Sequence, residues 1–222
     1  MRAVQTAFNQ FRDDWGLVYI DVGAYCGGYV KQCLKRFENA HVLAVEPCPK
    51  NFKVLKSKYG NNPRVALCNF MVGRTDGRET FYCTDIKGLN GSSESNTIFG
   101  DVLKKKKKHR KNMGGIKTRE VACTTMDSLL AMNDLDRVDI VKLNCEGGEY
   151  EIFEAETVDW LDVTSYIAID LHSDNSFYHT DEFIQKRRRI YDVLKNHGFV
   201  VMSGEAKAES KEDVSLLMKR MP

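Results

Sequence analysis

Short apolar runs recur along the chain and alternate with segments in which apolar residues return every three or four positions. Such runs are typical of strands that are buried on both faces, and the longer spacing is typical of helices with one apolar side. Strands are predicted at residues 17–22, 41–46, 65–69, 79–83, 118–123, 138–144, 166–172, 199–202 and 214–218, and helices at residues 27–37, 49–58 and 181–196.

Strands that alternate with helices in this way predict an α/β fold. We expect a mostly parallel seven-stranded sheet with helices on both faces and an antiparallel last strand. Right-handed crossovers place the carboxyl ends of the parallel strands at one edge, where such sheets bind ligands. The polar residues that end these strands, or follow them directly, are Asp21, Glu46, Asn69, Asn144, Glu146, Asp170 and His172.

Length and composition limit the possible classes of protein. The 222 residues suit a single domain spanning 1–222, and a net charge of +2 gives no overall attraction to nucleic acid or membrane. The sequence contains no apolar run of about 18 residues, so we expect no transmembrane helix. The N-terminus has no signal-peptide pattern, and the seven cysteines show no C-x-x-C spacing. We therefore expect a cytoplasmic protein with reduced thiols and no structural metal.

One long irregular segment interrupts the alternation at about residues 84–116. It is rich in Gly and Ser and then carries a dense basic block, Lys104–Lys111. Loops of this length inside a domain are usually functional or disordered, so we expect a lid-like loop. The basic block is either a solvated surface or an attractor for an anionic substrate or nucleic-acid phosphates.

The segment at residues 18–29 predicts a strand, a tight turn and a helix. Gly23 and Gly27 permit a turn that brings a ligand close to main-chain N–H groups and the positive end of the helix. The pattern is D-x-G-x-x-x-G and not the complete G-x-G-x-x-G, so it favours a dinucleotide only weakly.

Glu46 ends the next strand, about 20 residues beyond the turn, where a carboxylate can accept hydrogen bonds from ribose hydroxyls. No P-loop lysine follows the turn, and no third glycine completes a pyrophosphate clamp. An adenosyl ligand without a diphosphate fits better, and S-adenosylmethionine is the common one. We expect Asp21 and the glycine turn to face the amino-acid end of this cofactor.

Several segments resemble the FkbM family of S-adenosylmethionine-dependent methyltransferases, and the resemblance covers about residues 18–172. The most specific segment is Lys142–Glu149, which is similar to the family pattern K-I-D-V-E-G-x-E, and Ser92–Ser93 lies where members often carry a serine pair. The other matching segments are 21–27, 45–47, 71–73 and 124–130.

The resemblance implies the Rossmann-like class I methyltransferase fold and, most often, O-methylation of a hydroxyl on a small molecule or sugar. This sequence departs from the family pattern at Asn144, where the usual residue is Asp. An amide cannot serve as a charged base or metal ligand. The residues expected on the cofactor side are Asp21, Gly23, Ala24, Tyr25, Gly27, Glu46, Pro47, Asn69, Met71, Asn144 and Glu146.

A hydroxyl acceptor benefits from a general base, which typically contributes about 10²–10⁴-fold to the rate. We expect His172 to be this base, because it follows a strand end beside Asp170 and its ordinary pKa of about 6.5 suits proton transfer. Glu149 is the alternative base. These residues together with Glu146 could hold a divalent cation, but their spacing does not require one, and we predict no metal.

The main prediction is thus an S-adenosylmethionine-dependent O-methyltransferase whose acceptor contacts the loops at 84–116 and 172–180. A second hypothesis is an RNA or DNA methyltransferase recruited by Lys104–Lys111. A third is a catalytically inactive nucleoside-binding adaptor, for which Asn144 is the only sequence support.

Overall fold

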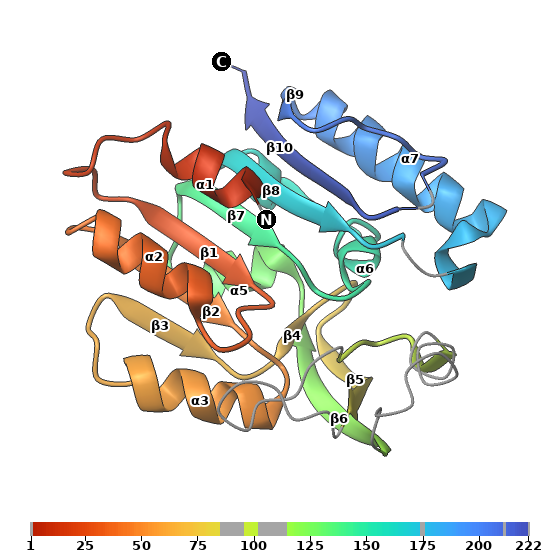
Figure 1. Ribbon diagram of the computed structural model, residues 1–222, viewed down its shortest axis with the longest axis horizontal. Coiled ribbons are helices and arrows are strands. Elements are labelled where there is room, and N and C mark those ends of the chain that lie inside the picture. The colour runs from red at the N-terminus through yellow and green to blue at the C-terminus, as the bar shows by residue number, and fades with distance from the viewer. Residues whose placement is uncertain (1, 85–95, 102–114, 174–175, 211, 222) are drawn as a thin grey trace.

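The computed structural model describes residues 2–84, 96–101, 115–173, 176–210 and 212–221, and within them seven strands form one sheet. Their order is β3-β2-β1-β7-β8-β10-β9 (Figure 1). β10 runs antiparallel to both of its neighbours, β8 and β9, and the other neighbouring pairs of this sheet are parallel, which confirms the predicted parallel arrangement with an antiparallel last strand. The strands are β1 (Val18–Val22), β2 (His41–Val45), β3 (Val65–Cys68), β7 (Val138–Leu143), β8 (Thr164–Leu171), β9 (Phe199–Ser203) and β10 (Val214–Arg220).

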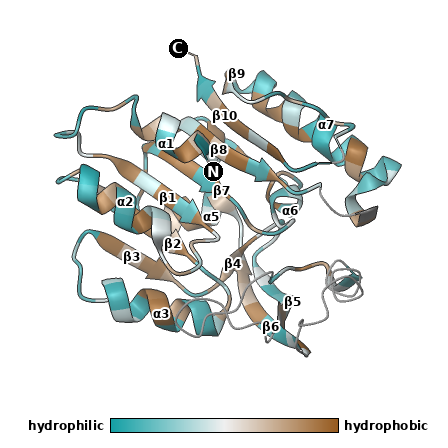
Figure 2. Cartoon of the chain, in the orientation of Figure 1, coloured by the Kyte–Doolittle hydropathy of each residue, from teal (hydrophilic) through white to brown (hydrophobic). Residues whose placement is uncertain are grey.

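Helices cover both faces of this sheet, and each face has its own apolar core. The helices α1 (Arg2–Phe8), α2 (Gly28–Arg36) and α3 (Pro49–Tyr59) cover one face. The helices α5 (Met126–Met132), α6 (Glu149–Ile152) and α7 (Asp181–Asn196) cover the other, together with the short 3-10 turns η2 (Asp159–Leu161) and η3 (Ser176–His179). Figure 2 shows the central strands mostly hydrophobic, whereas the helices carry hydrophilic outer sides.

Alternation along each strand assigns its side chains to the two cores. In β1, Ile20 and Val22 pack on the α5–α7 face, whereas Tyr19 packs on the α1–α3 face. Asp21 shares the face of Tyr19 because side chains two residues apart in a strand point the same way. An acidic side chain is therefore placed inside the sheet–helix core.

A second, smaller sheet lies below the carboxyl ends of the main strands. It has the order β4-β6-β5, made by β4 (Met71–Val72), β5 (Gly77–Thr84) and β6 (Ile116–Thr124). The predicted strands at 79–83 and 118–123 are confirmed, and they pair with each other instead of joining the main sheet. The turn at Asp76-Gly77, where Gly77 has a φ of +144°, leads into this hairpin-like pair.

The predicted irregular segment is only partly described. Residues 85–95 and 102–114, which include Ser92–Ser93 and Lys104–Lys111, lie outside the described residues. Residues 96–101 return to the second sheet, where Thr97 and Tyr82 exchange backbone hydrogen bonds of 3.0 and 2.8 Å. None of the helices in the described part of the chain combines the length and apolarity needed to span a bilayer.

Candidate functional site

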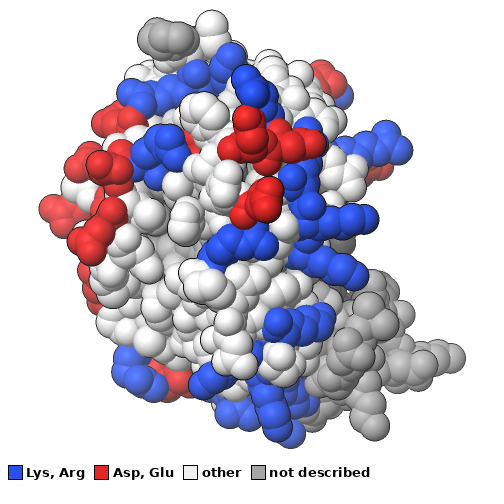
Figure 3. Space-filling view, turned by 90° about the vertical axis from the view of Figure 1, so that its left-hand side faces the viewer, with Lys and Arg blue, Asp and Glu red and all other residues white. Residues whose placement is uncertain are grey.

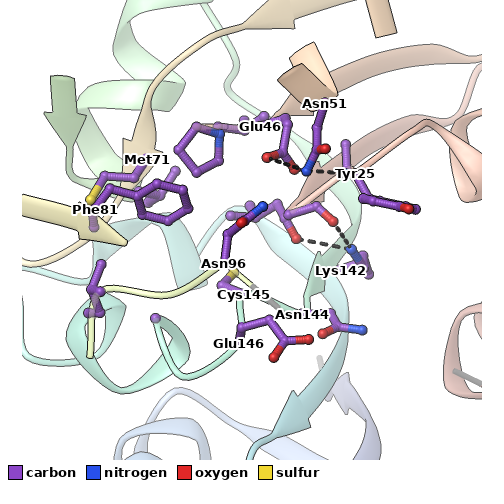
Figure 4. Close-up of a pocket in the computed structure, with 18 of the residues that line it drawn as sticks. Tyr25, Glu46, Asn51, Met71, Phe81, Asn96, Lys142, Asn144, Cys145 and Glu146 are labelled. Carbon is purple, nitrogen blue, oxygen red and sulfur yellow. Dashed lines mark hydrogen bonds between the residues drawn. The ribbon is translucent and has the colours of Figure 1, made fainter. Parts of the chain in front are cut away.

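A cavity of about 490 Å³ opens at the carboxyl edge of the main sheet, between that edge and the second sheet. Its volume falls in the range of about 300–1,000 Å³ that is usual for small-molecule sites. Figure 4 shows Met71 and Phe81 on one side of the cavity and Tyr25 and Lys142 on the other. The residues around it are Val22, Gly23, Ala24, Tyr25, Gly28, Tyr29, Val45, Glu46, Pro47, Asn51, Met71, Val72, Phe81, Asn96, Ile98, Lys142, Asn144, Cys145, Glu146 and Gly148.

The turn between β1 and α2 forms one wall of the cavity and depends on glycine. Gly23 has a φ of +74°, and a Cβ at this position would lie 2.1 Å from the carbonyl oxygen of Asn144. A side chain there would push the turn away from the loop after β7. Tyr25 also has a positive φ, +52°, and its backbone N–H donates to Glu46 Oε2 at 2.9 Å.

Gly27 serves a different purpose from Gly23. It has a φ of +79° and precedes α2, and a Cβ there would lie 2.4 Å from the Tyr59 ring. The Tyr59 hydroxyl donates to the Gly27 carbonyl at 2.9 Å. Gly27 therefore lets α3 pack against the turn, and it does not line the cavity.

A buried ion pair fixes the glycine turn from beneath. Lys142 in β7 is the register partner of Asp21 in β1, and its Nζ lies 2.8 Å from Asp21 Oδ1. The same ammonium donates to the carbonyl oxygens of Val22 at 3.1 Å and Gly23 at 2.7 Å. An ammonium has three donors, so these protein atoms take all of them. Lys142 thus positions the turn.

The ion pair also accounts for the charged state of Lys142, whose side chain is only 3% exposed. Burial alone would lower the pKa of Lys142, but the adjacent Asp21 carboxylate raises it above its ordinary value. Asp21, which we expected to face the cofactor, is fully buried and lies behind the turn.

Glu46 lies at the carboxyl end of β2 and borders the cavity. Besides Tyr25 N–H, its carboxylate accepts from Cys48 N–H at 2.9 Å and from Asn51 Nδ2 at 3.2 Å. Burial raises the pKa of the Glu46 carboxyl to about 8, although these hydrogen bonds favour the ionised form. Asn69 supports the same segment by donating from Nδ2 to the Glu46 carbonyl at 2.9 Å, outside the cavity wall.

The loop after β7 forms the opposite wall and carries Glu146. This residue has a φ of +53°, which is uncommon for any residue other than glycine. Its backbone carbonyl accepts from the Thr97 hydroxyl at 2.7 Å and from the Tyr178 hydroxyl at 3.3 Å. Segments from two other parts of the chain therefore hold this wall in place.

The predicted catalytic residues lie behind that wall and do not line the cavity. Glu149 is fully buried and accepts from the backbone N–H groups of Cys145 and Gly147, the latter at 2.9 Å. His172 Nδ1 lies 3.1 Å from Glu149 Oε1, and its Nε2 lies 3.9 Å from Glu146 Oε1. The three side chains thus form one charged group beneath the loop.

This group changes the titration of the histidine. Burial alone would lower the pKa of His172, but the carboxylates of Glu149 and Glu146 outweigh it and raise the pKa to about 10. The ring therefore holds its proton at neutral pH. A protonated imidazole cannot accept a second proton, so this protonation state does not favour His172 as the general base. That role stays a prediction.

Asp170 is bound to the residue that departs from the family pattern. The Asn144 amide Nδ2 donates to Asp170 Oδ2 at 3.3 Å. Burial raises the pKa of Asp170. An aspartate at position 144 would place two carboxylates in contact, so Asn144 suits its neighbour in β8.

Eight of the eleven residues predicted on the cofactor side border the cavity: Gly23, Ala24, Tyr25, Glu46, Pro47, Met71, Asn144 and Glu146. The prediction missed Lys142, although a lysine inside an apolar strand is itself a signal, because buried lysines need a partner. It also missed Phe81, Asn96 and Ile98, which reach the cavity only through pairing between the second sheet and residues distant in sequence.

All seven cysteines are free thiols, and within the described ranges no group of three or more His, Cys, Asp and Glu side chains is placed to hold a metal ion.

Comparison with known proteins identifies the fold and a family. A family model described as a methyltransferase FkbM domain matches residues 21–201. No curated protein sequence matches the chain significantly.

Solved structures resemble the chain at low sequence identity. A protein assigned as an rRNA methylase from Clostridium thermocellum is 10% identical, with a TM-score of 0.51 over 98% of this chain and 94% of the other. Fibrillarin from Methanococcus jannaschii is 12% identical, with a TM-score of 0.50 over 95% of this chain and 69% of the other. Likeness at this level of identity supports the predicted fold class.

The buried ion pair gives a first prediction. Replacing Lys142→Met leaves the Asp21 carboxylate buried without its cation, and breaking such a pair typically costs about 3–5 kcal/mol. We expect urea unfolding to show a loss of this size. The double variant Asp21→Asn/Lys142→Met should recover a large part of it, because no unpaired charge remains. A single variant as stable as the unmodified protein would contradict the proposed importance of the pair.

The charged group at His172 gives a second prediction. Its pKa of about 10 lies above the value of about 6.5 expected in the unfolded chain. The protonated ring therefore stabilises the fold fully below about pH 6.5, and this contribution is lost as the pH rises toward 10. We expect the free energy of unfolding to fall more steeply between pH 6.5 and 10 in the unmodified protein than in His172→Gln. Parallel pH profiles would contradict the ion pair.

Proposed function

The chain belongs to the FkbM family of S-adenosylmethionine-dependent methyltransferases, and on this premise we propose that it methylates a hydroxyl oxygen on a small molecule or sugar. The observation that carries the cofactor part of this proposal is the placement of Glu46, and the hydroxyl acceptor follows from the family. Its carboxylate borders a cavity of suitable volume, next to a glycine turn whose backbone approach excludes a side chain. A ribose-binding carboxylate beside such a turn suits an adenosyl ligand.

The residues around the cavity can be assigned to three parts of the cofactor: its ribose, its adenine ring and its amino-acid end. Glu46 would accept hydrogen bonds from the ribose hydroxyls, with its orientation fixed by Tyr25 N–H and Cys48 N–H. The apolar side chains of Met71 and Phe81 would form the wall for the adenine ring. These assignments agree with the expected roles of Glu46 and Met71 and add Phe81 to them.

The amino-acid end of the cofactor would then lie toward the turn at Gly23 and Ala24. Asp21 contributes there only through Lys142, because both side chains are buried beneath the turn. We infer that the ion pair acts mainly by holding the Gly23 carbonyl in place, with Lys142 at the wall of the cavity and Asp21 outside it.

S-adenosylmethionine supplies an activated methyl group, so the protein must mainly hold the acceptor oxygen in line with it. Positioning of this kind accounts for up to about 7–11 kcal/mol of barrier lowering in the best intramolecular reactions. Among the described residues, Glu146 is the carboxylate besides Glu46 that borders the cavity, and His172 Nε2 lies 3.9 Å from Glu146 Oε1. We therefore assign the acceptance of the hydroxyl proton to Glu146, with His172 and Glu149 holding its loop.

The adaptor hypothesis loses its only sequence support at Asn144. The amide is explained by its hydrogen bond to Asp170, and the proposed proton acceptor is a different residue. The proposal of an active enzyme therefore does not require an aspartate at position 144.

Calorimetric titration with S-adenosylhomocysteine tests the cofactor site. We expect saturable binding that Glu46→Ala weakens at least tenfold, which corresponds to about 1.4 kcal/mol. Glu156→Ala removes an exposed glutamate and should bind like the unmodified protein. Because Glu46 also holds local backbone, thermal melting must show that the variant is folded. A folded Glu46→Ala protein with unchanged affinity would overturn the ribose role.

The raised pKa of Glu46 predicts pH-dependent binding. Ribose hydroxyls donate to the carboxylate, so binding favours the ionised form and releases a proton from a group with a pKa of about 8. We expect the affinity for 5′-methylthioadenosine to rise from pH 6 to about pH 8 and then level off. This ligand lacks the titrating amino group of the full cofactor. Glu46→Gln should bind more weakly and independently of pH, and an equal pH dependence in both proteins would contradict the assignment.

A further inference from the structure

Helices α2 and α3 form a basic surface on one face of the protein. Together they contain seven Lys and Arg residues and no Asp or Glu, whereas the whole chain has a net charge of only +2. The remainder of the chain is thus net acidic, and these two helices carry a dense group of positive charges in addition to the Lys104–Lys111 block. In Figure 3 the face with α2 and α3 is turned to the right, and Lys and Arg side chains gather along that edge.

Five exposed lysines define what we call the α2–α3 basic face: Lys31 and Lys35 on α2, and Lys50, Lys53 and Lys56 on α3. Each helix buries its opposite side, through Val30 and Cys33 in α2 and through Asn51 and Leu55 in α3. At a rise of 1.5 Å per residue, successive lysines on one helix are about 4.5–6 Å apart along its axis. The result is two neighbouring rows of evenly spaced cations.

The composition of this face distinguishes among anionic partners. Among the described residues, the large apolar side chains that are exposed are Trp15, Met132, Val200, Val201, Met202 and Met221, and none belongs to α2 or α3. A helix that inserts into a bilayer needs apolar side chains on its membrane face, and a face without them is left with charge attraction to anionic lipid. A stable protein interface needs an apolar centre. A phosphate backbone, in contrast, is bound by lysine and arginine charge alone.

The position of α3 connects this face with the cavity. Pro47 and Asn51 border the cavity, and Lys50 lies between them at the beginning of α3. A polyanion bound along α3 would therefore lead directly to the edge of the site.

We propose that the α2–α3 basic face binds the phosphate backbone of a nucleic acid. The proposal stands on the charge and composition of the face, and it does not depend on which acceptor the proposed methyl transfer uses. Lys104–Lys111 lies outside the described residues and is not needed for this surface.

Fluorescence anisotropy with a labelled 20-nucleotide single-stranded RNA, and with DNA of the same sequence, tests the proposal. The test variant replaces Lys31, Lys35, Lys53 and Lys56 with Ala. We expect binding of at least one oligonucleotide to weaken at least tenfold in 100 mM KCl. The plot of log affinity against log salt should become shallower by about 3, because each lost phosphate contact on a single strand contributes about 0.7.

A matched control removes four exposed charges elsewhere, by Arg2, Arg74, Arg189 and Lys195→Ala. It has the same net charge as the test variant and should keep most of the affinity. Equal weakening in both variants, loss only in Lys104–Lys108→Ala, or tighter binding to poly-L-glutamate or phosphatidylserine vesicles would overturn the proposal. Titration with S-adenosylhomocysteine on the same variants reports separately on the cofactor site, which the substitutions should leave unchanged.

Discussion

The site depends first on the ion pair between Lys142 and Asp21. It joins β7 to β1 inside the sheet, and the same ammonium holds the carbonyl oxygens of Val22 and Gly23. The turn could not approach Asn144 so closely without both the absence of a side chain at Gly23 and a cation beneath it. Charge that is buried in the core therefore sets the backbone geometry at the surface of the cavity.

The loop after β7 is also held by a buried charged side chain, but here the charge is negative. Its N–H groups at Cys145 and Gly147 point to the buried Glu149 carboxylate, and His172 balances that carboxylate. Lysine beneath one loop presents donors to carbonyl oxygens, whereas glutamate beneath the other presents acceptors to N–H groups. Each loop is thus held through its backbone, which leaves Glu46 and Glu146 to border the space between the loops.

Much of this arrangement could be predicted from the sequence because it follows from local patterns. The apolar runs predicted the strands of the main sheet, and the spacing from the glycine turn to Glu46 predicted the edge at which the cavity opens. The second sheet could not be assigned, since pairing of β5 with β6 across the long irregular segment leaves no local signal. Asp21 and His172 lie at the carboxyl edge of the main sheet as predicted, but both side chains are buried and neither borders the cavity. Sequence position alone does not tell whether a polar side chain faces the cavity or the core.

Asn144 has a consequence for how sequences of this family should be compared. Positions 144 and 170 lie just after β7 and within its neighbour β8, and they share one hydrogen bond between an amide and a carboxylate. Aspartate at the first position and aspartate at the second exclude each other electrostatically unless a proton is shared. In this chain the amide at position 144 therefore depends on the carboxylate at position 170, and a sequence comparison that uses position 144 should include position 170 as well.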